Sequence, residues 1–281
     1  MTSRDQSGRT PGLILAALLS GSAFLAFPVA HAACATAVQE TARAGEVLDA
    51  QTLRLEDGSE VRLIGVLPPQ TPPWWKKPEP WPPAERARRA LSELIASAGL
   101  ELRAAEGEAQ RDRHDRLMAH VFVLRGEERI WVQAHLISAG LARAASFSRH
   151  RACARDLQRL EDRARANRVG LWDRGRFATI PAANTEALSK RRLQFQIVEG
   201  DVRAVAVRPQ WTFLNFGDDW RRDFTVAIAA KDRRRFRNSD VDLENLEGRT
   251  IRVRGWIESW NGPAIKVTHP EQIEVLARAR Q

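Results

Sequence analysis

Two hydrophobic periods alternate along residues 46–167. Apolar residues at every second position predict strands over 46–55, 60–67, 100–105 and 117–124, with Asp57-Gly58 as a hairpin turn. Apolar residues three and four apart predict helices over 84–98, 131–140 and 151–167. This part of the chain is therefore expected to mix strands and helices.

Strand periodicity prevails from residue 195 to residue 276. The predicted strands cover 195–207, 211–216, 223–229, 249–257, 264–267 and 272–276, and a helical or loop insertion is expected over 233–247. Small and polar residues over 177–187 predict a linker before a second domain at 188–281. Its pattern is similar to a small β-barrel of the oligonucleotide/oligosaccharide-binding (OB) type, and a small sandwich is the competing architecture.

The N-terminal residues 1–32 have the three regions of a secretory signal peptide. Arg4 and Arg9 precede an apolar run from Leu13 to Phe27, and small residues end at Ala32, where we expect cleavage. The protein is therefore expected to be periplasmic or secreted. No later segment reaches the roughly 20 apolar residues that span a bilayer.

The chain has two cysteines, Cys34 and Cys153. Because an exported chain meets an oxidising compartment, we expect them to form a disulfide, the alternative being two unrelated thiols. A lipid anchor at Cys34 is disfavoured, because the usual leucine is missing upstream. Neither cysteine belongs to a metal-ligand motif, and we predict no metal site from them.

The charge balance is basic. The formal net charge is +9, with 44 Lys and Arg against 35 Asp and Glu. Such a balance favours polyanionic partners such as nucleic acid. An arginine-rich genome is the competing explanation, consistent with nine tryptophans and no tyrosine.

Four segments share one order with a known family. They are residues 45–52 with 61–70, residues 112–119, residues 132–133 leading to 140–142, and Glu161 with 164–165 running into 170–172. Together they resemble the thermonuclease, or staphylococcal-nuclease-like, family over about residues 43–175. The resemblance implies an α+β fold for residues 33–176: a five-stranded OB barrel capped by helices.

The resemblance also locates an altered active site. Active members of the family place two calcium-binding aspartates and a water-activating glutamate at positions that hold Gln51, Leu67 and Gln70 here. Two phosphate-clamping arginines of the family match Arg62 and Arg116. The positive clamps are thus retained, whereas all three acids are replaced.

The replacements predict loss of catalysis. Calcium needs several oxygen ligands, many of them anionic, and leucine or a neutral amide does not replace them. The Gln70 amide is not a base near neutral pH. We therefore expect no cofactor, although calcium is the family's metal. His114 or His120 acting as base or as a transition-metal ligand is the alternative.

Two aromatic and basic clusters are further ligand candidates. They comprise Trp74, Trp75, Lys76 and Lys77 in a proline-rich loop, and Trp211, Phe213, Arg221, Arg222, Arg233, Arg234 and Arg235 in the second domain. Aromatic faces beside cations are typical of single-stranded nucleic acid binding. For the second cluster we favour a structural interpretation, in which Trp211 and Phe213 fill the barrel. For the proline-rich loop, outward and inward tryptophans are both open.

The sequence predicts an exported thermonuclease-like protein that binds nucleic acid, another polyanion or a periplasmic protein partner without hydrolysis. One alternative is an active phosphodiesterase with altered metal or base. The other is a structural envelope protein. The oligomeric state does not follow from the sequence.

Overall fold

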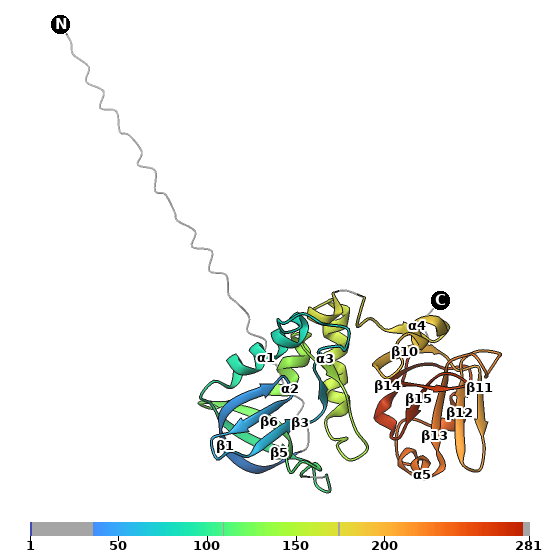
Figure 1. The fold of residues 1–281 in the computed structure, drawn as a ribbon, viewed down its shortest axis with the longest axis horizontal. Helices are drawn as coiled ribbons and strands as arrows, with labels where there is room; N and C mark the ends of the chain where they lie inside the picture. The colour runs from blue at the N-terminus through green and yellow to red at the C-terminus, as the bar shows by residue number, and fades with distance from the viewer. Residues whose placement is uncertain (2–35, 109, 174, 278–281) are drawn as a thin grey trace. The chain divides into compact units, whose positions relative to one another are not determined.

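The computed structural model describes residue 1 and residues 36–108, 110–173 and 175–277. The predicted signal peptide at 1–32 and Cys34 lie outside the described residues, apart from Met1. Residues 33–281 form one compact unit. It is mainly β with a few helices, so the predicted fold class is confirmed (Figure 1).

The first sheet is a closed barrel, here called the N-terminal barrel. Its strands are β1 (Ala37–Asp49), β2 (Thr52–Leu55), β3 (Glu60–Leu63), β5 (Gly99–Ala104), β6 (Leu117–Arg125) and β7 (Glu128–Trp131). They pair in the order β3-β2-β1-β5-β6-β7, and β3 also pairs in parallel with β6. This last pairing joins the end strand β3 to β6 and so closes five strands into a barrel, while β7 extends the sheet beyond β6.

Three helices cover this barrel: α1 (Pro82–Ile95), α2 (Val132–Ser138) and α3 (Ala154–Ala166). The apolar residues of each helix are spaced so that they share one face. That face is buried against the strands or a neighbouring helix. In α1 this face is Ala87, Leu91, Leu94 and Ile95. The predicted helices are thus present, with ends shifted by one to three residues.

Two predicted strands are in fact broken, and both breaks shape the site. The segment 46–55 contains the turn between β1 and β2, at Ala50 and Gln51. The segment 60–67 is interrupted at Gly65, whose φ of 79° suits glycine, and a Cβ there would lie 2.5 Å from the Leu157 side chain. Beyond this break, β4 (Val66–Leu67) leaves the barrel and pairs with β8 (Arg143–Ala144).

The second sheet, the C-terminal sheet, holds most of residues 180–275. Its strands are β9 (Ile180–Pro181), β10 (Phe195–Asp201), β11 (Ala204–Val207), β12 (Trp211–Asn215), β13 (Thr225–Ala229), β14 (Thr250–Trp260), β15 (Gly262–Val267) and β16 (Ile273–Val275). The order is β11-β12-β13-β15-β14-β10-β9, with β16 beside β14. Since β10 and β11 follow each other along the chain, the sheet curves into a partly closed barrel around its own hydrophobic cluster.

Short helices occupy the connections of the C-terminal sheet. They are α4 (Thr185–Ser189), α5 (Ala230–Arg233) and the 3-10 turns η2 (Arg234–Phe236), η3 (Leu243–Asn245) and η4 (Pro270–Gln272); a further 3-10 turn, η1 (Gly170–Trp172), follows α3 ahead of this sheet. The predicted linker at 177–187 contains β9 and the start of α4, and Ala182 is buried. Composition predicted the polar character of this segment but not its pairing with β10, a contact distant in sequence.

A buried ion network joins the two sheets. Arg254 of β14 donates to a Glu161 carboxylate oxygen at 2.6 Å and to the Ala144 carbonyl at 3.1 Å, and it also contacts Glu274. The side chains of Arg254 and Glu161 are fully buried. Burial alone would lower the pKa of Arg254, but the charges of Glu161 and Glu274 outweigh it and raise the pKa.

Further polar contacts surround this network. Arg151 donates two hydrogen bonds, of 2.8 and 2.7 Å, to the Glu271 carboxylate. Ser146 Oγ and His269 Nε2 lie 2.8 Å apart in a buried hydrogen bond. Arg155 of α3 donates to the Ile273 carbonyl at 3.0 Å. The N-terminal barrel and the C-terminal sheet are therefore held in one arrangement by charged and polar contacts.

Candidate functional site

Gln51 occupies the turn between β1 and β2 and is only 5% exposed. Its amide nitrogen donates to the carbonyls of Leu63 and Val66 at 3.0 and 2.8 Å, and its oxygen accepts from Arg62 Nη2 at 3.0 Å. These partners require an amide, because a carboxylate has no N–H to offer two carbonyls. A neutral side chain is therefore built into the position that carries an acid in the family pattern.

The other two replaced positions also carry no charge. Leu67 lies in β4 and is half-buried against β8, while Gln70 is exposed on the loop that follows. Both line the same cavity as Gln51. The three positions are thus brought together by the fold, as the resemblance implies.

Several acids of the surrounding segments already have partners. Asp49 accepts a hydrogen bond from the Gln51 backbone N–H at 2.6 Å, and Glu60 pairs with Arg54 at 3.3 Å. Asp115 lies 3.4 Å from Arg111. Within the described residues no three His, Cys, Asp or Glu side chains form a group that could hold a metal. At this position the Gln51 amide offers N–H groups, and the Arg62 guanidinium already occupies the amide oxygen. These side chains therefore do not fit calcium, which needs oxygen ligands.

The two matched arginines differ in their surroundings. Arg116 donates from Nε and Nη2 to Asp112 at 2.8 and 2.6 Å, so its charge is largely compensated. Burial raises the pKa of Asp112, but the hydrogen bonds from Arg116 and from backbone N–H groups overcome this and lower it to about 2. Arg62 has no carboxylate ion pair within the described part of the chain. Burial and the charge of Arg116 lower its pKa.

A cavity of about 390 Å³ opens beside Gln51 and Arg62. Three further arginines that the sequence analysis missed line it: Arg143, Arg176 and Arg191. Arg143 follows directly on the family segment 140–142, and this position is the one feature of the sequence that could have identified it. The others come from the second half of the chain, where no motif marks them.

Arg143 is the most enclosed of these cations. It donates to the Phe195 carbonyl at 2.6 Å and lies over the rings of Phe177 and Phe195 at 5.3 and 5.0 Å. Its Nε is buried and donates no hydrogen bond within the described residues. Burial lowers its pKa to about 10, so it remains charged at neutral pH.

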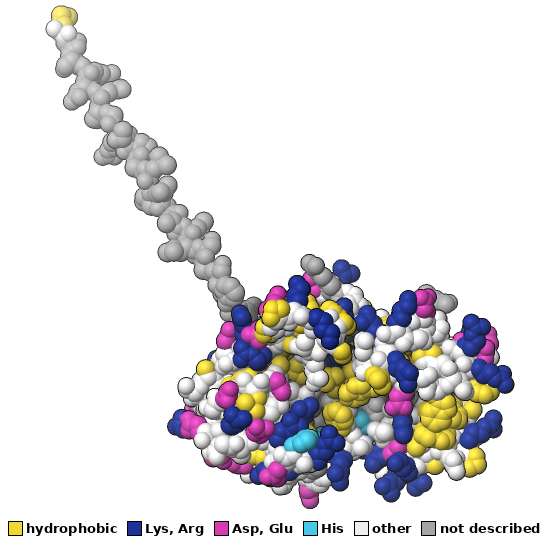
Figure 2. Space-filling model, in the orientation of Figure 1, with side chains coloured by type: hydrophobic (Ala, Val, Ile, Leu, Met, Phe, Trp, Pro, Cys, Tyr) yellow, Lys and Arg dark blue, Asp and Glu magenta, His cyan; other side chains and the backbone are white. Residues whose placement is uncertain are grey.

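Aromatic side chains line the same cavity. Trp74, Phe147 and Trp256 are 51%, 40% and 40% exposed. Trp256 packs edge-on against Phe195 at 5.0 Å, and Trp81 is buried at the start of α1. Figure 2 shows hydrophobic side chains reaching the surface in the middle of the visible face, with Lys and Arg around them.

The proline-rich loop combines the two alternatives left open by the sequence. Trp74 is half-exposed in the cavity, with Arg176 4.6 Å from its ring centre. Trp75 is half-buried, donates to the Glu79 carbonyl at 2.8 Å and carries Lys77 at 5.1 Å from its ring. Lys76 is exposed, and neither lysine lines the cavity.

The interpretation of Trp211 and Phe213 as barrel filling is wrong. The two residues alternate along β12 with buried Thr212 and Leu214, so they face away from the hydrophobic cluster. They stack on each other at 6.3 Å, and both pack edge-on against Trp260. Periodicity identified the shared face but could not decide which face is the inner one.

The arginines of the second candidate cluster lie apart from the cavity. Arg221 lies over the exposed Trp220 at 4.6 Å, and Arg222 and Arg234 are exposed. Arg233 donates to a backbone carbonyl and Arg235 pairs with Asp232. The arginines in this set do not line the cavity beside Gln51.

The histidines offer no base at the site. His120 is 1% exposed, packs against Trp131 at 5.4 Å, and burial lowers its pKa to about 4. His114 is exposed and accepts a hydrogen bond from Arg113. Neither lines the cavity that contains Gln51 and Arg62.

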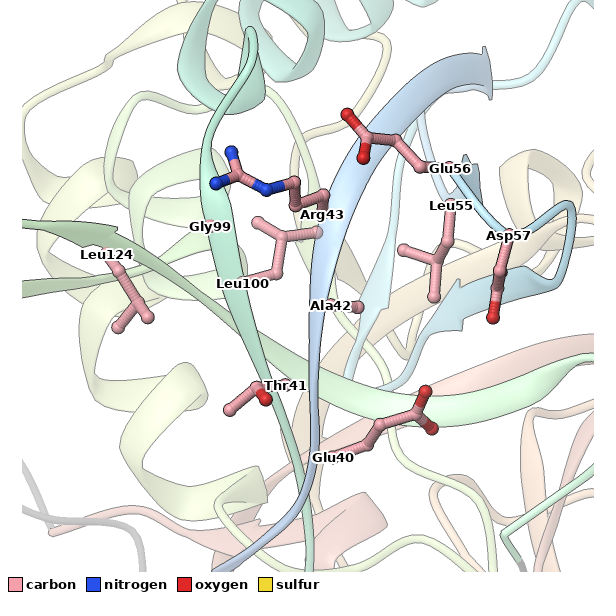
Figure 3. Close-up of a pocket in the computed structure, with 10 residues that line it drawn as sticks. All are labelled: Glu40, Thr41, Ala42, Arg43, Leu55, Glu56, Asp57, Gly99, Leu100 and Leu124. Atoms are coloured by element: carbon pink, nitrogen blue, oxygen red, sulfur yellow. The ribbon is translucent and has the colours of Figure 1, made fainter.

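A second hollow, of about 550 Å³, lies on another part of the N-terminal barrel. Figure 3 shows Glu40 and Glu56 at opposite ends of it, with Arg43 pointing outward beside β1. Three acids, including Asp57, face one cation there. The hollow therefore does not suit an anion.

Five strands close the N-terminal barrel, and the altered site beside it keeps arginines. Residues 60–174 match the family model described as Staphylococcal nuclease homologue, so this part of the chain is a domain of that family. No curated protein matches the chain. The family is normally one of nucleases, so the protein is nuclease-like at the level of the family, which connects it with nucleic acid. No helix among the described residues is long and apolar enough to cross a membrane.

Proposed function

We propose that the protein binds a phosphate-bearing polyanion at the altered nuclease site and does not hydrolyse it. The observation that carries the proposal is the Gln51 amide, which donates to two carbonyls where the family pattern has an acid. Its oxygen orients Arg62 toward the cavity edge. The site therefore keeps a cation for phosphate while it offers calcium no charged ligand.

The loss of catalysis follows from the chemistry of hydrolysis. Water attack on a phosphodiester needs a base and compensation of the charge that develops on phosphorus oxygens. Gln70 is not a base, and the nearby acids are held by other partners. Arginine binds phosphate through paired N–H groups and needs neither base nor metal to do so. Export remains a prediction, and it would place this binding in the periplasm or outside the cell.

Digestion assays test the absence of hydrolysis. Labelled DNA and RNA are incubated with the purified protein in calcium, manganese and zinc buffers, and acid-soluble nucleotides are measured. We expect none above background. Release of nucleotides that Arg62→Gln abolishes would show an active phosphodiesterase and overturn the proposal.

Filter binding tests the polyanion. We expect salt-sensitive retention of nucleic acid, weakened about tenfold by Arg62→Gln because a charged hydrogen bond to phosphate is lost. Arg86→Gln is the matched control, since Arg86 is an exposed arginine of α1 outside the cavity. Equal retention by both variants would contradict the assignment of Arg62. Absence of salt-sensitive retention of DNA, RNA and heparin would contradict the function itself.

A further inference from the structure

We propose that the C-terminal sheet completes the site, and that the cavity between it and the N-terminal barrel binds single-stranded nucleic acid. Bases would stack on Trp74, Phe147 and Trp256, and phosphates would meet the arginines that line the cavity. This inference rests on the proposed function and names its ligand class. It also assigns part of the site, including Arg191 and Trp256, to residues outside the part of the chain that matches the nuclease family.

The charge of the cavity is the first support. The described residues that line it include four arginines and no carboxylate. Arg62, Arg143, Arg176 and Arg191 form no ion pair with a carboxylate within the described part of the chain, unlike most other arginines near the interface, such as Arg151. Cations gathered in one cavity without a direct carboxylate partner attract a polyanion. The Nε of Arg143 is buried and donates no hydrogen bond within the described residues.

The exposed aromatic residues favour a polyanion that carries accessible bases. Phe147 packs against Trp256 at 5.9 Å and Trp74 packs edge-on against Trp81 at 6.3 Å. Trp74, Phe147 and Trp256 nevertheless each keep 40% or more of their surface accessible in one cavity. Rings interleaved with cations are what single-stranded nucleic acid binding uses, because bases stack while phosphates are neutralised. A duplex hides its base faces, and an anionic glycan has no flat aromatic face to stack.

The interface makes the cavity rigid. Arg254, buried with Glu161 and Glu274, fixes β14, which carries Trp256, to α3 of the N-terminal barrel. Arg143 contributes to both halves, because it lies in β8 and donates to the Phe195 carbonyl of β10. Rings held in place before binding lose little conformational entropy when a base stacks on them.

Fluorescence anisotropy with three probes tests the ligand class. The probes are a labelled oligothymidylate, a DNA duplex of the same length and heparin, all at one salt concentration. We expect the single strand to bind at least about tenfold more tightly than the duplex, because stacking needs an accessible base face. Equal or tighter binding of the duplex or of heparin would overturn the inference.

Substitution of an indole tests the contribution of the C-terminal sheet. Trp256→Ala is expected to weaken oligothymidylate binding about tenfold. Trp220→Ala is the matched control, because Trp220 is also half-exposed but lies outside the cavity. A loss of affinity in Trp220→Ala without one in Trp256→Ala would move the site to the surface around Trp220 and refute the proposal.

Two substitutions of the exposed Leu193 that differ only in charge test the cavity without disturbing its packing. Leu193 lines the cavity, is 75% exposed and has a φ of 61°, a conformation that asparagine and aspartate adopt readily. Leu193→Asp is expected to bind about fivefold more weakly than Leu193→Asn, because only the aspartate adds a charge that repels phosphate. Equal affinity of the two variants would count against the cavity as the path of the strand.

The two proposals can fail separately. If Arg62→Gln weakens binding but Trp256→Ala and Leu193→Asp do not, polyanion binding stands and the composite site is refuted. If nucleic acid is hydrolysed while all three variants weaken binding, the composite site stands and the non-catalytic function is refuted.

Discussion

Replacing Arg254 by leucine is predicted to destabilise the protein by about 3–5 kcal/mol, because it leaves buried carboxylates without their cation. Arg254 and Glu161 are both fully buried, and Glu161 uses its second oxygen to accept from the Ala144 N–H at 2.8 Å. With Arg254 gone, Glu161 cannot reach water. Glu274 is less affected, since Arg252 lies 3.4 Å from it.

The large predicted loss of stability arises because Arg254→Leu removes only one partner of a buried ion pair. The double variant Arg254→Leu with Glu161→Leu removes both fully buried charges, and its cost should be clearly smaller than the sum of the two single costs. Arg54→Gln provides a surface comparison. Its partners Glu46 and Glu60 are accessible to water, so its loss should cost less than about 1 kcal/mol.

Urea unfolding followed by tryptophan fluorescence measures these differences, with the slope of the transition checked for constancy. Oligothymidylate binding by the folded variant provides a second readout, since β14 carries Trp256. A cost of Arg254→Leu below about 1 kcal/mol, or full additivity of the two single substitutions, would refute the picture of a buried, coupled ion network.

Three further predictions concern acid stability, a clamp and a turn. Burial lowers the pKa of His120 and His269 from 6.5 to about 4, so the unfolded chain binds protons first and stability should fall as the pH drops through this range. The loss is about 3 kcal/mol for each ring, and His120→Leu should flatten the profile measured by urea unfolding. Asp112→Asn keeps the acceptor for two backbone N–H groups but releases Arg116, so the dependence of oligothymidylate affinity on salt should steepen by about 0.7 in the logarithmic slope; an unchanged slope would show that Arg116 does not reach the ligand. Gly140→Ala should lower stability by about 2 kcal/mol or more in thermal unfolding, because φ is 62° and the new Cβ would lie 2.1 Å from a backbone oxygen; a neutral effect would contradict this close approach.

Periodicity and motifs predicted much of the N-terminal barrel. The three helices and most strands of the described residues occur where the apolar spacing placed them, because burial of one face is a local property of the sequence. The same spacing could not show the turn at Gln51 or the departure of β4 at Gly65. Those breaks depend on contacts with distant strands and helices.

The sequence identified the arginines that carry charge at the site, but it did not show which of them has a carboxylate partner. Arg62 and Arg116 match the same family pattern, yet Asp112 compensates one, while the other faces the cavity. Orientation in β12 likewise had to await the structure, since Trp211 and Phe213 share a face that alternation alone does not label as inner or outer.

The amino-acid sequence by itself determined the nuclease-type barrel and the absence of acids at Gln51, Leu67 and Gln70, because residue identity and local spacing need no knowledge of distant contacts. Only the tertiary structure decided that Arg143 of one half and Trp256 of the other line one cavity. Such a site arises from pairings between segments more than 100 residues apart, as between Arg254 and Ala144. No local pattern specifies them, because they depend on how two separately formed hydrophobic cores are joined.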